Sequence, residues 1–431
     1  MDPETLLTTI SNSPASDLQL PERAIWPQYA GLSVGNLPAA IVSLLGAGPS
    51  AEMLPPLRLD LLDGLTDGVR RVVLVLVDGL GWLRFQRLLE ETPGLQFAHL
   101  AQAGRLLPLT SIFPSTTNNV LTTLWTGAPP GRHGLIAYNL YFREWAMALE
   151  AISFAPIFRS FAGDLDRWGL IDETFIPVPS LGQWLAAQAI PTEVVISEKI
   201  MGSALSRLNF RGVRKIWGHA AASDFWLQLR RVLERSRDDR LYLYGYWSAL
   251  DTFAHRFGPW DESSTGELHA LDFMLRDNFL RGLSPEARQG TLFLLIADHG
   301  QIDAPMEKAF ILERHPELRD ALLLPPLGEA RAAFLYARAG KARFVRDYLA
   351  AHSEERFILH SRSDLLRSGL LGPAPYHPEI GFRLGDWIAL GRDQACLTPT
   401  ENDARRLLGR HGGLSPEEML VPLLAVRLDR L

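Results

Sequence analysis

Three runs of hydrophobic residues along the chain each end at an aspartate. The runs and the acids that follow them are 72–77 with Asp78, 292–297 with Asp298, and, more loosely, 241–250 with Asp251. Runs this apolar are typical of strands that are buried on both faces of a parallel sheet. Because the carboxyl ends of parallel strands meet at one edge, where open α/β sheets bind ligands, we expect the three aspartates to gather there.

Helical patterns lie between these strands, for example over 81–91 and 266–283. Strands that alternate with helices predict an α/β fold, with a mostly parallel sheet and helices on both faces. The segment from about 140 to 235 is rich in aromatic and turn residues and is expected to be an insertion that caps the active-site edge. A smaller excursion, which contains several prolines, is expected over about 302–380.

The amino-acid composition excludes some classes of binding partner and some kinds of metal site. The 431 residues include 43 Lys+Arg and 49 Asp+Glu, a formal charge of −6, which argues against binding to nucleic acid polymers or anionic membranes. The single Cys396 excludes an internal disulfide and a cysteine-based zinc module, so any metal must be bound by histidines and carboxylates.

The chain shows no apolar stretch of the length that a membrane span needs, about 20 residues. Its first residues, MDPETLLTTISNSP, contain acids and prolines and lack the apolar core of a signal peptide. These features predict a cytoplasmic protein.

Three histidines accompany the strand-end aspartates. Asp251 and His255 are four residues apart and would share one side of a helix, while His299 directly follows Asp298. His411 lies in a loop with two glycines. Three Asp and three His suit zinc or manganese. Each aspartate could instead cap a helix, and two further histidines compete with His411 for the last position. These rivals are His360 and His377.

The sequence TSIFPSTTNN, residues 110–119, precedes a helical pattern over 120–126. Its hydroxyl residues Ser115, Thr116 and Thr117 therefore stand near a helix N-terminus, where backbone N–H groups and the helix dipole favour an anion such as phosphate. A hydroxyl bound to a divalent cation is also a nucleophile near neutral pH. The alternative is that these residues only cap the helix.

The motifs together resemble the nucleotide pyrophosphatase/phosphodiesterase branch of the alkaline phosphatase superfamily. The matching pieces are VLVDGLGW, FPSTT, Thr126-Gly127, His133-Gly134, Asn139, DTFAHRFGP and IADHG. The resemblance spans about 78–300 and resumes at His411. It implies an alkaline-phosphatase-like catalytic domain over 71–431, with residues 1–70 as an N-terminal extension packed on this core.

By position, the resemblance implies two bound cations, most simply zinc, with manganese as the alternative. One cation would be held by Asp251, His255 and His411. The other would be held by Asp78, Asp298, His299 and Thr117. The spacing to Thr126-Gly127 selects Thr117 as the nucleophile, which would form a covalent phospho-threonine intermediate. Asn139 would donate to a phosphate oxygen, although a shift of one residue would put Tyr138 there. The sequence around His411 departs from the family pattern.

These features predict a two-metal hydrolase of phosphodiester or pyrophosphate bonds, acting on a small phosphate ester of nucleotide type. A phosphomonoesterase or phosphomutase on the same fold is the first alternative, and a catalytically silent binding module is the second. A monoesterase usually adds a cation near the metals. The candidates, Arg143, Arg159 and Arg256, are not placed there by any motif, which favours diesters. Aromatic residues of 138–158 predict either a nucleobase platform or a small core of the insertion.

Overall fold

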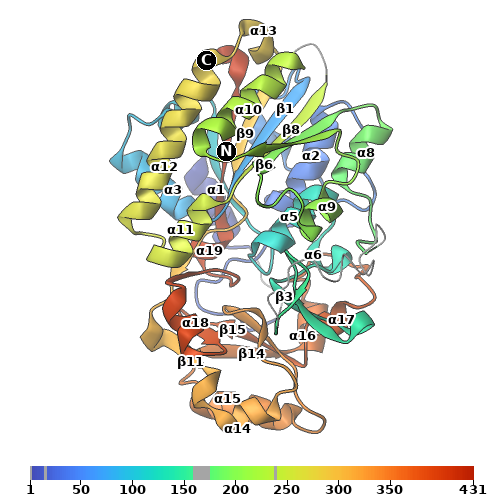
Figure 1. Ribbon diagram of the computed structural model, residues 1–431, viewed down its shortest axis with the longest axis vertical. Helices are drawn as coiled ribbons and strands as arrows, with labels where there is room; N and C mark the ends of the chain where they lie inside the picture. The colour runs from blue at the N-terminus through green and yellow to red at the C-terminus, as the bar shows by residue number, and fades with distance from the viewer. Residues whose placement is uncertain (1, 14–16, 159–174, 237–239) are drawn as a thin grey trace.

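The computed structural model describes residues 2–13, 17–158, 175–236 and 240–431. Its centre is a seven-stranded sheet in the order β2-β18-β9-β1-β8-β6-β7 (Figure 1). Neighbouring strands are parallel from β9 to β7, and β18 runs antiparallel to both β2 and β9. The strands are β1 (Arg71–Val77), β2 (Arg105–Thr110), β6 (Thr192–Ser197), β7 (Lys215–His219), β8 (Leu241–Trp247), β9 (Thr291–Ile296) and β18 (Leu420–Arg427).

The apolar runs of the sequence form the middle of this sheet because helices cover both of its faces (Figure 1). All residues of β1, β8 and β9 are buried. One face is covered by α3 (Trp82–Glu91), α4 (Gln96–Ala103), α10 (Ala222–Arg235) and α12 (Glu262–Met274). The other face is covered by α2 (Leu37–Leu44), α5 (Thr117–Thr126), α8 (Leu181–Ala187) and α9 (Ala204–Asn209). The predicted α/β architecture is confirmed.

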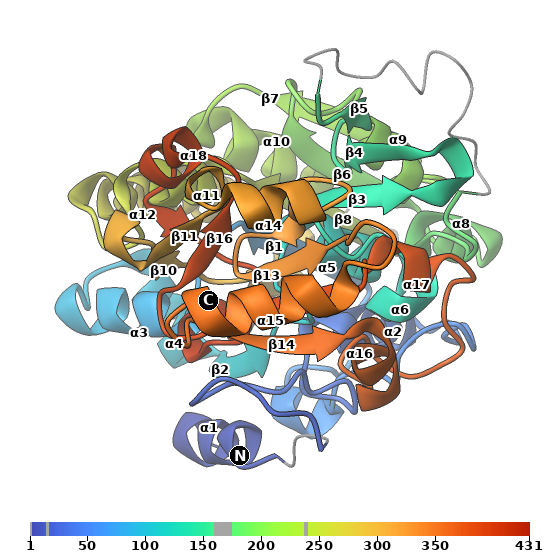
Figure 2. The ribbon, with the colours of Figure 1, turned by 90° about the horizontal axis from the view of Figure 1, so that it is seen from below.

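A second, antiparallel sheet lies beside the central one, in the order β14-β15-β13-β12-β3-β4-β5 (Figure 1). Its strands are β3 (Asn139–Phe142), β4 (Met147–Glu150), β5 (Ala155–Pro156), β12 (Leu327–Glu329), β13 (Ala332–Leu335), β14 (Phe357–Ser361) and β15 (Trp387–Gly391). Gly328 pairs with Asn139, so two segments about 190 residues apart in the sequence form one sheet. The helices α14 (Pro316–Ala321) and α15 (Ala342–His352) cover its outer side (Figure 2).

The prediction that residues 140–235 form an insertion is wrong for the second half of this range. Residues 139–156 do leave the central sheet, but β6 and β7 pair within it and α10 covers it. In the edge strand β7 only His219 is buried. Its sequence therefore contains no apolar run from which a strand could be predicted. The excursion near 302–380 supplies β12, β13 and β14 to the second sheet, which continues to β15.

Short elements complete the chain. The helices are α1 (Pro3–Ser11), α6 (Pro130–His133), α11 (Ala249–Phe257), α13 (Pro285–Arg288), α16 (Arg362–Ser368), α17 (Ile380–Arg383), α18 (Glu401–Arg406) and α19 (Pro416–Met419). The strand pairs are β10 (Ile302–Asp303) with β17 (Gly409–Arg410), and β11 (Ala309–Ile311) with β16 (Cys396–Thr398). None of the helices in the described ranges is long and apolar enough to span a membrane.

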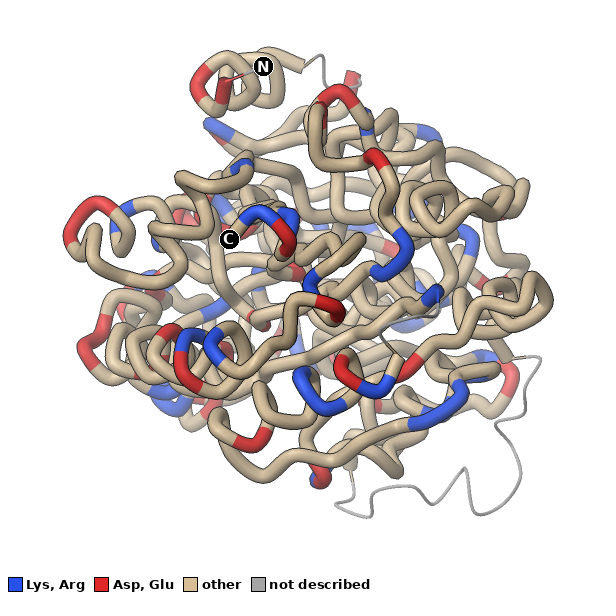
Figure 3. The backbone as a smooth tube through the Cα atoms, turned by 90° about the horizontal axis from the view of Figure 1, so that it is seen from above, with Lys and Arg blue, Asp and Glu red and all other residues tan. Residues whose placement is uncertain are grey.

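Residues before β1 pack on the central sheet and on α5. Leu6 and Ile10 of α1 are buried, and α1 lies against β2. Ser33 forms a bridge with Thr110, and α2 contacts α5. Basic and acidic residues are interspersed along the chain in the view of Figure 3.

Candidate functional site

The structure brings the three strand-end aspartates together at one edge of the central sheet. Asp78 directly follows β1, Asp298 comes two residues after β9, and Asp251 lies in the first turn of α11, which follows β8. Because β8 and β9 are the two neighbours of β1, the strands deliver their acids side by side.

Asp78, Asp298 and His299 form the more buried part of the site. The Nε2 atom of His299 lies 3.5 Å from Asp78 Oδ1 and 3.4 Å from Asp298 Oδ2, and at most 3% of any of the three side chains is exposed. Thr117 Oγ1 is 3.2 Å from His299 Nε2 and 3.4 Å from Asp78 Oδ1. The threonine hydroxyl therefore faces the carboxylate and the imidazole together.

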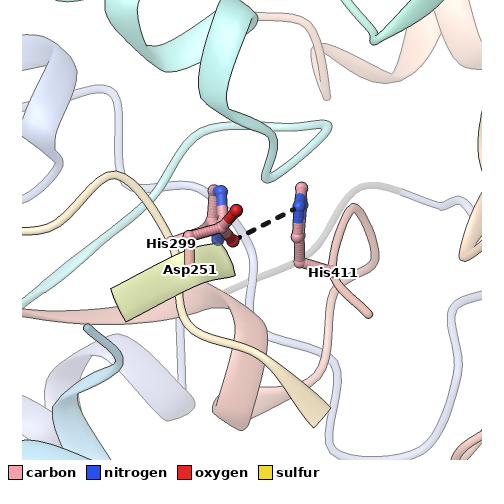
Figure 4. Close-up of side chains that lie close together, drawn as sticks. All are labelled: Asp251, His299 and His411. Carbon is pink, nitrogen blue, oxygen red and sulfur yellow. Dashed lines mark ion pairs between the residues drawn. The ribbon is translucent and has the colours of Figure 1, made fainter. Parts of the chain in front are cut away.

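Asp251, His255 and His411 form the more open part. Asp251 Oδ1 lies 3.4 Å from His255 Nε2 and 3.9 Å from His411 Nε2, and 17%, 22% and 9% of the respective side chains are exposed. Figure 4 shows Asp251 facing His411, with their ion pair as a dashed line, and His299 next to Asp251 in this view. The rings of His299 and His411 stack with their centroids 3.7 Å apart, so the two parts of the site share a boundary.

Backbone carbonyls orient all three histidines in the same way. The Nδ1 atoms lie 2.7 Å from Gly409 O for His255, 3.1 Å from Gly300 O for His299 and 2.9 Å from Ser115 O for His411. A proton on each Nδ1 satisfies these carbonyls and leaves Nε2 with a free lone pair that faces the aspartates. This arrangement is the one that metal-binding histidines commonly adopt.

Thr117 is the first residue of α5, and Thr116 is the extended residue that precedes the helix. Thr117 belongs to the cluster, whereas the Thr116 hydroxyl lies close enough to the carboxyl group of Glu329 to lower its pKa. Asn118 and Asn119 turn inward, where they donate to the carbonyls of Ala137 and Pro114. The N-terminus of α5 thus presents Thr117 to the aspartates.

Negative charge is crowded in the site. Burial, together with the nearby Asp298 and Asp251, raises the pKa of Asp78 well above its usual range. Asp298 Oδ2 is fully buried and has no hydrogen-bond partner among the described residues. Burial, with His299 and His255 close by, lowers the pKa of His411, which keeps the ring neutral. Buried carboxylates that lack partners call for cations.

The donor atoms fit divalent metal ions. One ligand atom each from Asp78, Asp298 and His299 lie within 4.8 Å of one another, and the same holds for Asp251, His299 and His411. Neutral imidazoles and carboxylates, without a thiolate, are the donors that zinc and manganese accept. The structure thus contains two candidate metal-binding clusters.

Two polar residues that the sequence did not single out hold the aspartates in place. The Tyr246 hydroxyl on β8 donates to Asp78 Oδ2, and burial raises the pKa of Tyr246, which keeps this donor protonated. The Gln301 side chain donates to Asp251 Oδ1. Gln301 extends the IADHG motif by one residue, so its position beside His299 was a signal. Tyr246 gave none, because it lies inside an apolar run.

A third such residue, Glu329, reaches the site from the second sheet. Its Oε1 accepts a hydrogen bond of 2.8 Å from the backbone N–H of Tyr138. Burial raises the pKa of Glu329 to about 7, whereas the bonds from Thr116 and Tyr138 and the nearby His299 and Arg410 act to lower it. The sequence around Glu329 contains no motif, since only the pairing of β12 with β3 brings it here.

Asn139 begins β3 and is partly buried. No hydrogen bond in the described ranges joins its side chain to Thr117 or to the predicted ligands, so its role stays a prediction. The backbone of the alternative residue, Tyr138, is bound to Glu329. The aromatic residues that follow pack on one another and on Phe175, as a small core would, while 70% of Phe158 is exposed. The packed rings are Phe142, Trp145 and Phe154.

The competing histidines lie elsewhere. His360 Nε2 is 2.7 Å from the carbonyl of Gln19, and His377 Nδ1 accepts from the N–H of Glu379. Neither belongs to a described candidate metal cluster.

The two described arginines that could neutralise charge at the site form other contacts. Arg143 pairs with Glu379 at 2.8 Å, and the guanidinium group of Arg256 lies over the ring of Phe257. Arg159 lies outside the described residues.

A mainly apolar pocket of about 210 Å³ opens beside Thr117. Thr117, Asp78 and Asp251 line its mouth, and Leu121 and Trp125 continue along the same face of α5. Its remaining walls come from β6, β8, α9 and neighbouring residues: Ile152, Ile196, Ile200, Ser203, Leu205, Ser206, Asn209, Phe210, Tyr244, Tyr246, Ser248 and Thr252. The pocket can hold one uncharged group next to the aspartates.

Solved structures share this fold. Murine ectonucleotide pyrophosphatase / phosphodiesterase 5 is 17% identical, with a TM-score of 0.62, over 82% of this chain and 87% of the murine chain. An inactive form of the murine protein with a threonine-to-alanine substitution, in complex with AMP, is 16% identical, with a TM-score of 0.63, over 83% and 88%. Phosphonoacetate hydrolase from Sinorhizobium meliloti 1021, in complex with phosphonoformate, is 16% identical, with a TM-score of 0.60, over 82% and 89%.

No curated protein matches the chain. The family model of type I phosphodiesterases / nucleotide pyrophosphatases, however, matches residues 72–154 and 168–414, more than half of the sequence. Both matched ranges include predicted site residues, from Asp78 to His411. The chain therefore belongs to the type I phosphodiesterase / nucleotide pyrophosphatase family of hydrolytic enzymes.

Proposed function

We propose that the chain hydrolyses phosphodiester or pyrophosphate bonds of small, nucleotide-type substrates at two divalent cations, with Thr117 as the nucleophile. The observation that carries the proposal is the position of the Thr117 hydroxyl, 3.2 Å from His299 Nε2 and 3.4 Å from Asp78 Oδ1. Asp78, Asp298 and His299 would hold one cation, and Asp251, His255 and His411 the other.

When bound, the two cations would stabilise the entering and leaving oxygens of an in-line displacement at phosphorus. Thr117 Oγ1 then forms a bond to phosphorus while the bond to the departing alcohol or phosphate breaks. Water next attacks the phospho-threonine, which releases the phosphate product and restores the hydroxyl. The N-terminus of α5 and a donor such as Asn139 would stabilise the developing charge.

The pocket beside Thr117 supports a substrate with one uncharged substituent. Its volume of about 210 Å³ and its apolar wall suit a ring such as a nucleobase or an aryl group. Among the structural neighbours, the murine protein is in complex with AMP and the bacterial hydrolase with phosphonoformate. Of the divalent metals, zinc is the one that we propose. A cytoplasmic location remains a prediction that cell fractionation would test.

Replacing Thr117 by alanine tests the nucleophile. Thr117→Ala is expected to lower the turnover of bis-p-nitrophenyl phosphate by about a thousandfold or more, because the attacking oxygen is lost. Metal content, measured by elemental analysis, should stay near two ions per chain, since six other ligands remain. Thr117→Ser, which keeps a hydroxyl, should recover part of the turnover.

Thr116→Ala is the matched neighbour control and should cost at most about tenfold. The proposal would be contradicted if Thr116→Ala abolished turnover while Thr117→Ala remained active. The ratio of diester to monoester turnover distinguishes the alternatives, because a preference for p-nitrophenyl phosphate would identify a phosphomonoesterase or mutase. Metal binding without turnover of either ester would identify a silent binding module.

A further inference from the structure

Glu329 is a carboxylate at the site that the two candidate metal clusters do not use. It ends β12, and its Oε1 accepts the N–H of Tyr138 at 2.8 Å. The hydroxyl of Thr116 lies close enough to the same carboxyl group to lower its pKa. Because Thr116 directly precedes the first residue of α5, the Glu329 carboxyl group lies near the helix N-terminus that carries Thr117.

The stem of Glu329 packs against the loop that carries His411. A Cβ atom at Gly412 would lie 2.4 Å from Glu329 Cβ, and Gly412 has a φ of +109°, so glycine is required there for two reasons. His299 and Arg410 are close enough to influence the charge of Glu329. The guanidinium group of Arg410 itself donates to the carbonyl of Asp403.

The position of this negative charge affects the choice of substrate. A helix N-terminus favours an anion, but here the Glu329 carboxyl group lies beside Thr116, the residue that precedes Thr117. Each further negative charge on the substrate is then repelled in a partly buried setting, where charge–charge interactions are strong. A phosphodiester carries one negative charge at pH 9, and a phosphomonoester carries two.

We propose that Glu329 is a specificity-determining residue that disfavours doubly charged phosphomonoesters relative to singly charged diesters. This inference rests on the proposed function, since it assumes that phosphate esters bind at Thr117. The residue that would distinguish diesters from monoesters thus belongs to the second sheet.

The first test compares kcat/KM for bis-p-nitrophenyl phosphate and p-nitrophenyl phosphate at pH 9. E329Q, which keeps the shape and removes the charge, should lower the diester-to-monoester ratio by about tenfold. E329D should retain the wild-type preference, and E401Q, which removes a charge from the exposed ion pairs on α18, should leave the ratio unchanged. Equal losses on both substrates would mean that Glu329 only positions the loops, and would overturn the proposal.

The second test measures binding without turnover. Calorimetry on zinc-loaded protein with Thr117→Ala should show that E329Q tightens binding of inorganic phosphate about tenfold but changes dimethyl phosphate binding less than twofold. Similar changes for both anions would refute the proposal. If the wild type hydrolyses neither ester, the proposed function fails, yet this binding ratio still decides the role of Glu329. Should E329Q not fold, as judged by thermal melting, E329N makes the same comparison.

Discussion

The two parts of the site differ in how far they are removed from water. Asp298 and His299 are wholly buried at the end of β9, whereas Asp251 and His255 on α11 have 17% and 22% of their side chains exposed. The buried part is fixed by neighbouring strands of the central sheet. The open part depends on one helix and on the loop at His411. We therefore expect the buried part to bind its cation tightly and the open part to exchange its cation more readily.

The largest expected effect comes from breaking the buried part. Asp298→Asn removes a charge from a carboxylate with an unpartnered oxygen, so one cation should be lost and turnover should fall by about a thousandfold or more. Elemental analysis and steady-state kinetics with bis-p-nitrophenyl phosphate measure both. Excess zinc should not restore activity, and a variant that regains full turnover in zinc would show that the two parts are equivalent.

A smaller effect is expected at the open part. His255→Ala removes one ligand from a group in which Asp251 and His411 remain, so turnover should fall by about 10- to 100-fold. Excess zinc should recover much of this loss, because solvent can supply the missing ligand. The measurement is the zinc dependence of turnover. A loss as large and as irreversible as that of Asp298→Asn would remove the distinction.

The smallest effects should come from the residues that hold the aspartates. Tyr246→Phe frees Asp78 in the buried part, and Gln301→Leu frees Asp251 in the open part. Loss of such an orienting bond typically costs about tenfold or more in activity or metal affinity. Turnover should fall further in Tyr246→Phe, since water can replace the lost amide donor only at the open part. Equal losses in the two variants would contradict this ranking.

Local patterns in the sequence were enough to predict the strands that carry the ligands. Each of these patterns lies within about ten consecutive residues. Asp78 ends an apolar run, and Asp251 is four residues from a histidine. The predicted α/β fold follows from the same runs. The edge strand β7 was missed, because it is mostly only partly buried and shows no continuous apolar pattern.

Residues that reach the site through long-range pairing could not be predicted. Glu329 arrives because Gly328 pairs with Asn139, and nothing in either sequence announces that partner. Asn139 was selected from a motif, but its side chain forms no described bond to the cluster. Motifs identify residues that carry chemistry, while the neighbours that tune them depend on the packing of distant segments.

The arrangement of β2 and β18 makes the attachment of β2 to the central sheet depend on a strand that lies much later in the sequence. Among the described strands of the central sheet, β2 is paired with β18 alone, and β18 separates it from β9. The segment that leads from β2 to Thr117 is therefore joined to the sheet through residues synthesised about 300 positions later. A chain synthesised only as far as β9 contains the three aspartates but has neither the strand that joins β2 to the sheet nor His411, so the last part of the sequence completes the site.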